Sequence, residues 1–483
     1  MTDTYGNFLD GKWVKARTAF ASINPADARD VIGMFASADT ADVRRAIDAA
    51  AGALASWKSL SGFGRGEFLR KASDILQGRL EEVAQAMVRE NGKTIAEARG
   101  ETARGVALLR FYAAEGVRPC GEVIPSVNPR TFVYTTRVPL GVVSVITPWN
   151  FPVAIPIWKI APALVYGNTV VFKPASATPH CGVLVAGLFE ESGIPQGVIN
   201  LVTGGGRDIG EELVRNPKVH GVTFTGSNSV GRRIGSWAAE RGTKFQLEMG
   251  GKNPVIVMPD CDLEQAVTLT LRGAFGYAGQ KCTATSRAIV LDSVYDSFVE
   301  KLVDKTRALK VGPGTDEGNF VPPVVSEEQQ RSILAAIEKG KAEARLLCGG
   351  GVPSGEAYAH GFYVAPTIFT DVTADASLAQ EEIFGPVLAI MRARNLDEAI
   401  ALANQVRFGL SASIFTRDLN TVQEYAGRIE AGVVKVNSET AGIEPQVPFG
   451  GVKESSSHSR EQGRAALEFF TSIRSVYIDR AGC

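Results

Sequence analysis

Short apolar runs alternate with amphipathic stretches over residues 141–247 of this chain. Five runs rich in β-branched residues have the length of buried strands, at residues 141–146, 169–172, 198–202, 219–224 and 244–247. Helical periodicity fills the gaps between them, at residues 159–165, 181–191, 208–215 and 230–240. This order predicts a parallel sheet with helices on both faces.

The same α/β pattern continues on either side of this region. Upstream, three long amphipathic helices are predicted at residues 40–57, 64–91 and 94–115. After Gly251 the alternation begins again, with strands and helices expected at residues 254–258, 263–278, 288–291 and 294–309. The restart predicts a second α/β domain, and 483 residues are too many for one compact core.

Two alternating segments, residues 131–138 and 473–478, belong to neither α/β region. A strand that lies far from any β-α-β unit often pairs with another chain. We therefore expect both segments to take part in an oligomer. An edge strand within the same chain is the alternative.

Composition and charge narrow the class of protein. The formal net charge is −1, so no basic field favours nucleic acid or acidic lipid. No apolar stretch is long enough to span a bilayer, and residues 1–6 lack a signal-peptide pattern. We expect a cytoplasmic protein with no membrane or nucleic-acid partner.

Metal chemistry has little support in the sequence. The six cysteines form no C-x-x-C pair, and the four histidines lack the spacing of metal ligands. In a reducing compartment the cysteines should be free thiols. We predict no metal site.

Three motifs supply the parts of a nucleophilic site. Cys282 lies in Gly-Gln-Lys-Cys-Thr, Glu248 in Leu-Glu-Met-Gly-Gly, and Asn150 in Pro-Trp-Asn-Phe-Pro. A thiol that is a few per cent ionised at neutral pH attacks carbonyl carbons, a carboxylate activates water, and an amide stabilises an oxyanion. Each motif alone is weak, but together they predict oxidation of an aldehyde through a thioester.

The three motifs, in this order, resemble the aldehyde dehydrogenase superfamily over nearly the whole chain. The resemblance implies two doubly wound parallel-sheet domains and a β-hairpin oligomerisation arm, in a homotetramer or homodimer. It divides the chain into a dinucleotide-binding domain (1–117 and 139–249), a catalytic domain (250–447), and an arm with a C-terminal strand (118–138 and 448–483). A binding protein that kept this fold without catalysis is the alternative from another class.

The strand-to-turn segment Thr225-Gly226-Ser227 is a candidate cofactor site. Gly226 allows close approach of the backbone, and Ser227 can cap the following helix, whose N-terminal amides attract pyrophosphate. Gly226 and Gly231 also match the spacing of a P-loop. Arg232-Arg233 replaces the required Lys-Ser/Thr, which disfavours a phosphotransferase.

The resemblance places further residues at the nicotinamide cofactor: Ile146, Trp149, Lys173, Ser176, Glu382 and Phe384. Gly206, in the glycine run after the strand at 198–202, is expected to give the backbone of the dinucleotide clearance. Many NAD-preferring members carry Glu where this chain has Ser176. A glutamate would repel a 2′-phosphate, whereas Ser176 and Lys173 can bind one. We therefore predict NADP as the cofactor, with NAD also accepted.

The substrate prediction rests on the tail at residues 455–463 and the motifs near Gly250 and Cys282. They resemble a branch of α-ketoglutarate semialdehyde (2,5-dioxovalerate) dehydrogenases. The paired arginines of succinate-semialdehyde dehydrogenases are absent, since Trp158 and Gly276 occupy their positions. Succinate semialdehyde and a broad range of aldehydes remain alternatives. Arg287 and Arg460 are candidates for the substrate carboxylate, with a structural role as the favoured reading.

Overall fold

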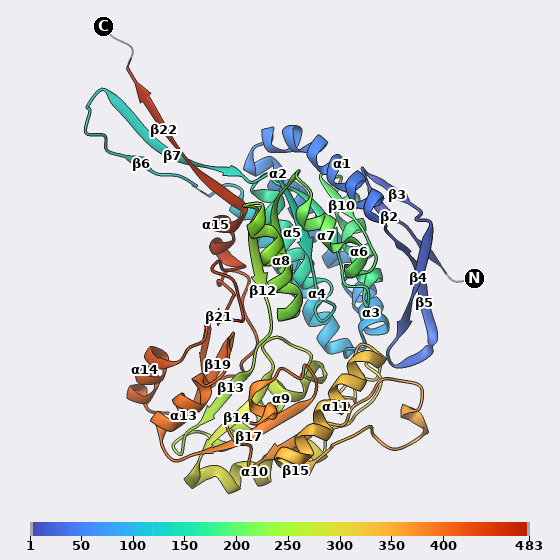
Figure 1. The fold of residues 1–483 in the computed structure, drawn as a ribbon, viewed down its shortest axis with the longest axis vertical. Coiled ribbons are helices and arrows are strands. Elements are labelled where there is room, and N and C mark those ends of the chain that lie inside the picture. The colour runs from blue at the N-terminus through green and yellow to red at the C-terminus, as the bar shows by residue number, and fades with distance from the viewer. Residues whose placement is uncertain (1–2, 119, 481–483) are drawn as a thin grey trace.

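Two mostly parallel seven-stranded sheets lie one above the other in the computed structural model, which describes residues 3–118 and 120–480 (Figure 1). Cys483 lies outside the described residues, as do Met1 and Thr2. The predicted α/β class with two helix-covered sheets is confirmed.

The first sheet has the order β12-β11-β8-β9-β10-β2-β3. The five strands from β12 to β10 run parallel, and β2 and β3 form an antiparallel edge on the other side. The strands are β2 (Asn7–Leu9), β3 (Lys12–Val14), β8 (Val142–Ile146), β9 (Thr169–Lys173), β10 (Ile199–Leu201), β11 (Val219–Thr225) and β12 (Lys244–Glu248). The five parallel strands match the predicted ones, whereas the edge strands were not predicted.

Helices cover both faces of this sheet, and each group buries its own apolar cluster against it. One group is α1 (Thr40–Ser59), α7 (Gly206–Arg215) and α8 (Asn228–Glu240). The other group is α2 (Gly62–Gly78), α3 (Leu80–Asn91), α4 (Ile95–Glu115), α5 (Ala154–Val165) and α6 (Pro179–Glu191).

Two predicted helices in the second group had wrong boundaries. The single helix expected at residues 64–91 is two helices, because the chain leaves helical geometry at Arg79 after the weak helix former Gly78. The helix expected at 159–165 begins earlier, at Ala154. The Glu101 carboxylate on α4 accepts the N–H groups of Val153 (2.9 Å) and Ala154 (3.0 Å), and so caps α5 from a distant part of the chain.

The second sheet has the order β15-β16-β17-β14-β13-β19-β20, with β15 as its antiparallel edge. The strands are β13 (Asn253–Val257), β14 (Thr285–Leu291), β15 (Arg345–Cys348), β16 (Thr367–Thr370), β17 (Val387–Ala393), β19 (Ser411–Phe415) and β20 (Val433–Val436). The helices of this half are α9 (Leu263–Phe275), α10 (Asp292–Arg307), α11 (Glu327–Glu343), α12 (Ser377–Gln380), α13 (Leu396–Asn404) and α14 (Leu419–Arg428).

Smaller elements complete the structure. One small sheet contains β1 (Thr4–Tyr5), β4 (Thr18–Asn24) and β5 (Asp27–Ser37), and another pairs β18 (Phe408–Gly409) with β21 (Val452–Lys453). The 3-10 helices are η1 (Gly276–Gly279), η2 (Glu356–Tyr358) and η3 (Gly463–Ala465), and α15 (Ala466–Phe470) follows η3.

A three-stranded arm projects from the body (Figure 1). It consists of β6 (Val123–Ile124), β7 (Thr131–Pro139) and β22 (Thr471–Asp479), and it contains both of the isolated predicted strands. These two strands pair with each other along their full length, from Thr471 opposite Pro139 to Asp479 opposite Thr131. The pairing is therefore internal to the chain, and an oligomer stays a prediction.

None of the helices within residues 3–118 and 120–480 has the length and apolar character needed to cross a bilayer.

Candidate active site

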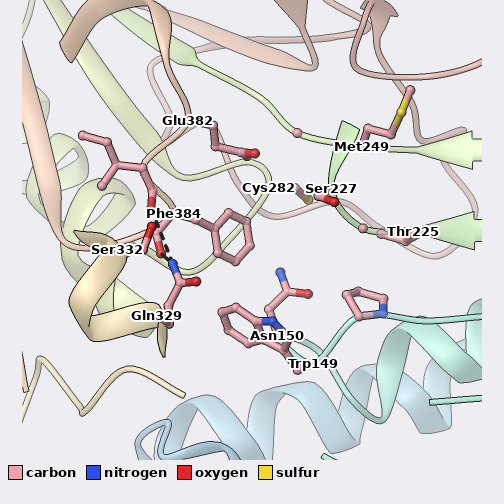
Figure 2. A pocket seen from close by; sticks show the side chains of 14 residues that line it. Trp149, Asn150, Thr225, Ser227, Met249, Cys282, Gln329, Ser332, Glu382 and Phe384 are labelled. Atoms are coloured by element: carbon pink, nitrogen blue, oxygen red, sulfur yellow. Dashed lines mark hydrogen bonds between the residues drawn. The ribbon is translucent and has the colours of Figure 1, made fainter. Parts of the chain in front are cut away.

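A cavity of about 280 Å³ lies where the carboxyl end of the first sheet faces the second sheet. Loops after β8, β11 and β12 line it from one side, and the loops before β14 and β17 line it with α11 from the other. Figure 2 shows its side chains. Seven of the predicted site residues line it: Trp149, Asn150, Gly226, Ser227, Cys282, Glu382 and Phe384.

Cys282 is held by an unusual turn between α9 and β14. The predicted helix 263–278 ends at Phe275, and the left-handed residues Tyr277 (φ 58°) and Ala278 (φ 50°) reverse the chain. Gly279 (φ 69°) must be glycine, since a Cβ there would lie 2.2 Å from the Gly385 carbonyl oxygen. This turn fixes the backbone that carries the sulfur.

The Cys282 thiol is uncharged at neutral pH in this state. Burial raises its pKa to about 12, and the nearby carboxyl groups of Glu382 and Glu248 act in the same direction. These surroundings disfavour the thiolate that the sequence led us to expect. The nucleophile needs a base or a positive charge beside it before it can attack.

Asn150 lines the same cavity as Cys282. Its Nδ2 donates a hydrogen bond to the Gln280 carbonyl (3.1 Å), and its backbone carbonyl accepts one from Lys93 Nζ (2.9 Å). One N–H of the amide remains to serve an oxyanion. The buried Oδ1 has no hydrogen-bond partner within residues 3–118 and 120–480, which marks a place for a polar ligand group.

Glu248 stands beside the cavity and does not line it in this conformation. It ends β12 and is 1% exposed. Its Oε2 accepts a hydrogen bond from Ser456 Oγ (2.5 Å), while Oε1 has no partner among the described residues.

The environment of Glu248 favours its neutral form. Burial raises its pKa well above the usual value, and the neighbouring Glu461 carboxyl adds to that effect. The Ser456 hydrogen bond lowers the pKa, as do the charges of Lys159 and Arg460. In its ionised form, a carboxyl group with a raised pKa is a stronger base and is suited to take a proton from water.

Glu382 and Phe384 form the wall opposite Trp149 (Figure 2). Glu382 Oε1 accepts the Gly251 N–H (2.9 Å), and burial raises the pKa of this carboxyl to about 7. The Phe384 ring stands edge-on to the Trp149 indole, with the ring centres 5.3 Å apart. Gln329 Nε2 donates to the Phe384 carbonyl (3.1 Å) and holds this loop to α11.

The turn after β11 opens α8 toward the cavity. Gly226 has no room for a side chain, because a Cβ would lie 2.5 Å from the Phe224 ring. Ser227 stands at the N-cap as predicted, but its hydroxyl makes no capping bond and lies 3.3 Å from Ser229 Oγ. The first amides of α8 are thus left for an anion, and the buried Thr225 Oγ1 beside them has no partner in the described chain.

Four predicted cofactor residues lie outside this cavity, along the carboxyl edge of the first sheet. They are Ile146, Lys173, Ser176 and Gly206. Ile146 and Lys173 are opposite each other at the ends of β8 and β9. Gly206 begins α7, and Ser176 Oγ donates to the Gly204 carbonyl (2.8 Å), which joins the two loops.

Lys173 is suited to a polar cofactor group. Its buried Nζ donates to the Pro174 carbonyl (2.9 Å), and within residues 3–118 and 120–480 it has no carboxylate partner. Burial lowers its pKa to about 8. This ammonium, the unpartnered Thr225 hydroxyl and the open end of α8 together fit a dinucleotide.

Neither of the two arginines considered for a substrate carboxylate lines this cavity. Arg287 is 1% exposed and donates to the carbonyls of Lys252 (3.0 Å), Leu402 (2.9 Å) and Ala403 (2.8 Å), so its role is structural. Arg460 acts electrostatically on Glu248.

Sequence reasoning missed Ser456, whose contact with Glu248 arises only when residues 455–457 pair with β12.

Comparisons with known proteins agree on the family. The aldehyde dehydrogenase family model matches residues 13–476. Alpha-ketoglutaric semialdehyde dehydrogenase of Bacillus subtilis is 52% identical and covers 99% of this chain and 98% of its own length. Alpha-ketoglutarate semialdehyde dehydrogenase of Haloferax volcanii is 44% identical and covers 99% of both chains.

A solved structure has the same fold. Betaine aldehyde dehydrogenase of Staphylococcus aureus, in complex with NAD+, matches with a TM-score of 0.96 at 34% identity. The match covers 98% of this chain and 95% of that one.

Proposed function

The chain belongs to the aldehyde dehydrogenase family, and from this premise we propose that it oxidises α-ketoglutarate semialdehyde (2,5-dioxopentanoate) to α-ketoglutarate through a thioester on Cys282. It is an enzyme that uses a nicotinamide cofactor. The observation that carries the mechanism is the placement of the Cys282 sulfur and the Asn150 amide on one cavity.

The chemistry follows from the side chains at this cavity. Cys282 gives its thiol proton to the neighbouring Glu248 carboxylate, which passes it to solvent. The thiolate attacks the aldehyde carbon, and the oxyanion is bound by the Asn150 amide and the Cys282 backbone N–H. The bound oxidised nicotinamide supplies the hydride acceptor. Glu248 then takes a proton from water, which attacks the thioester and releases the acid.

The identity of the substrate is supported by the two relatives, whose names both specify α-ketoglutarate semialdehyde. It is also supported by Trp158 and Gly276, which stand where the arginine clamp for a shorter semialdehyde is expected. The direct test is a panel of carboxylate-bearing, aliphatic and aromatic aldehydes with NAD and with NADP. A kcat/KM for 2,5-dioxopentanoate below that for succinate semialdehyde or neutral aldehydes would contradict the proposal.

We further propose that the first sheet and its helices form the dinucleotide-binding domain (1–117 and 139–249), and that the second forms the catalytic domain (250–447).

We also propose that the arm mediates a homodimer or homotetramer. Apolar side chains lie exposed on it, with exposed fractions of 50–69% for Phe132 (51%), Ile473 (61%), Tyr477 (69%) and Ile478 (50%). Light scattering of the chain with and without residues 471–480 tests this.

The cofactor is proposed to be NADP, because Ser176, three residues after Lys173, has no charge that would repel a 2′-phosphate and carries a hydroxyl that can bind one. Ser176→Glu is expected to lower kcat/KM for NADP about 100-fold through like-charge repulsion, with a change of less than about threefold for NAD. Ser176→Gln, which has the same size without the charge, is the control. A wild-type kcat/KM for NAD more than about a hundredfold above that for NADP would contradict the proposal.

Ser456 is proposed to tune the base. Its hydrogen bond favours ionised Glu248, so Ser456→Ala should raise the pKa of Glu248 and move the rise of kcat about one unit to higher pH. The charges that face Glu248 (Glu461, Lys159 and Arg460) stay unchanged in this variant. Ser456→Thr keeps the hydroxyl and should restore the wild-type profile. Coincident pH profiles for all three enzymes would contradict this role.

A further inference from the structure

Arg104 is a half-buried arginine on α4 that has no ion-pair partner within residues 3–118 and 120–480. One terminal nitrogen donates to Gln462 Oε1 (2.8 Å), and the other donates to the Ile443 carbonyl. Both acceptors are neutral. They satisfy two of the guanidinium hydrogens and leave its charge uncompensated.

Glu101 is the carboxyl group with the largest effect on the pKa of Arg104, and it is already paired with Lys93. Burial lowers the pKa of Arg104, and the charge of Glu101, one turn earlier on α4, opposes that effect. Glu101 forms a buried ion pair with Lys93 and accepts the N–H groups at the start of α5. A desolvated cation without its own anion is unfavourable until an anion binds to it.

An aromatic wall borders Arg104, formed by Phe151, Trp158, Tyr277 and Phe449. The guanidinium lies over the Trp158 indole, 5.8 Å from the ring centre. Trp158 contacts Phe449 (5.8 Å between ring centres), and Phe151 contacts Tyr277 (5.1 Å). None of these four side chains lines the cavity that contains Trp149 and Phe384.

The aromatic wall joins Arg104 to the candidate catalytic groups. Phe151 directly follows Asn150, which lines the same cavity as Cys282. Phe449 directly precedes Gly450, where an added Cβ would lie 2.9 Å from Glu248 Oε1. The aromatic wall is therefore joined through the chain to Asn150 and packs beside Glu248, on residues that do not line the cofactor cavity.

The other cations near the aromatic wall are committed elsewhere. Lys93 pairs with Glu101, and Lys281 lies 3.6 Å from Glu439. Arg287 is surrounded by backbone carbonyls, and Arg460 acts on Glu248 itself. Arg460 donates a hydrogen bond to the Ser459 carbonyl (3.4 Å), and Arg104 differs from it in lying over the Trp158 ring of the aromatic wall.

We propose that Arg104 binds the carboxylate of the aldehyde substrate, with the aldehyde end directed toward Cys282. This inference rests on the proposed function, an aldehyde that carries a carboxylate at its other end. A guanidinium holds a carboxylate through paired, charge-assisted hydrogen bonds, and a 2-oxo group beside the carboxylate offers a further acceptor. The aromatic wall packs against the two methylene groups between the ends.

The test is the ratio of kcat/KM for 2,5-dioxopentanoate to that for pentanal, a neutral aldehyde of the same length. Arg104→Met keeps the length and packing of the side chain and removes the charge. It is expected to lower kcat/KM for the anion about 100-fold and to change that for pentanal less than about threefold. Arg104→Lys keeps the charge without the fork and should lose about tenfold for the anion. Arg110→Met, on an exposed position of the same helix, is the control and should match the wild type.

The outcomes separate the two proposals. A wild-type enzyme that does not prefer the anion over pentanal contradicts the proposed substrate, whatever Arg104 does. A wild-type preference that survives Arg104→Met overturns the role of Arg104 and leaves the proposed function standing. Equal losses for both aldehydes in Arg104→Met also overturn it, because they indicate a purely structural role.

Discussion

Replacing Cys282 by alanine is expected to abolish aldehyde oxidation, with kcat falling more than about 10⁴-fold. The reaction needs a covalent bond between the sulfur and the aldehyde carbon, and no other cysteine among residues 3–118 and 120–480 lines the cavity. The absorbance of the reduced cofactor as it forms measures the loss of activity. Cofactor binding should persist, because the predicted cofactor contacts lie on other residues.

A second cysteine provides the control for this experiment. Cys261 is a partly exposed free thiol near the start of α9, outside the cavity. Cys261→Ala should oxidise aldehydes at the wild-type rate. Substantial turnover by Cys282→Ala with any aldehyde would show that another group is the nucleophile.

Replacing Glu248 by glutamine is expected to separate the two halves of the reaction. Glutamine has nearly the same size and still accepts the Ser456 hydrogen bond, but it cannot take a proton from water. A burst of about one reduced cofactor per active site should therefore remain, while steady-state kcat falls about 100- to 1,000-fold. Rapid mixing with absorbance detection resolves both phases.

The matched control is Glu240→Gln, because Glu240 lies at the end of α8 in an exposed ion pair with Arg215. That variant should keep wild-type kinetics. Steady-state turnover at the wild-type rate in Glu248→Gln would contradict the assignment of Glu248 as the hydrolytic base.

The strands and their chemistry were readable from local patterns. The runs at residues 141–146 and 219–224 are strands β8 and β11, since continuous β-branched apolar runs suit strands buried on both faces. Their carboxyl ends carry Asn150 and Gly226, because parallel strands end at one edge of a sheet. The motif around Cys282 singled out this cysteine, but only the folded structure shows that it lines the cavity at that edge of the sheet.

The boundaries that were wrong depend on contacts between distant segments. α5 begins early because Glu101 on α4 accepts its first N–H groups. α9 ends early because the left-handed Tyr277 donates its backbone N–H to Glu97 (2.5 Å), far away in sequence. The local pattern of apolar residues cannot predict these helix ends, because each depends on a hydrogen bond to a residue more than fifty positions away.

The sequence by itself determined the α/β class and the alternation of strands and helices along the chain, and it singled out Cys282, Glu248 and Asn150 as candidates, because these depend on residue type and short-range spacing. Only the tertiary structure decided the protonation and orientation of these groups. Burial raises the pKa of the Cys282 thiol, Ser456 holds one oxygen of Glu248, and Arg104 has no ion-pair partner within residues 3–118 and 120–480. The physical reason is that desolvation, hydrogen bonding and charge compensation depend on which distant segments meet in space.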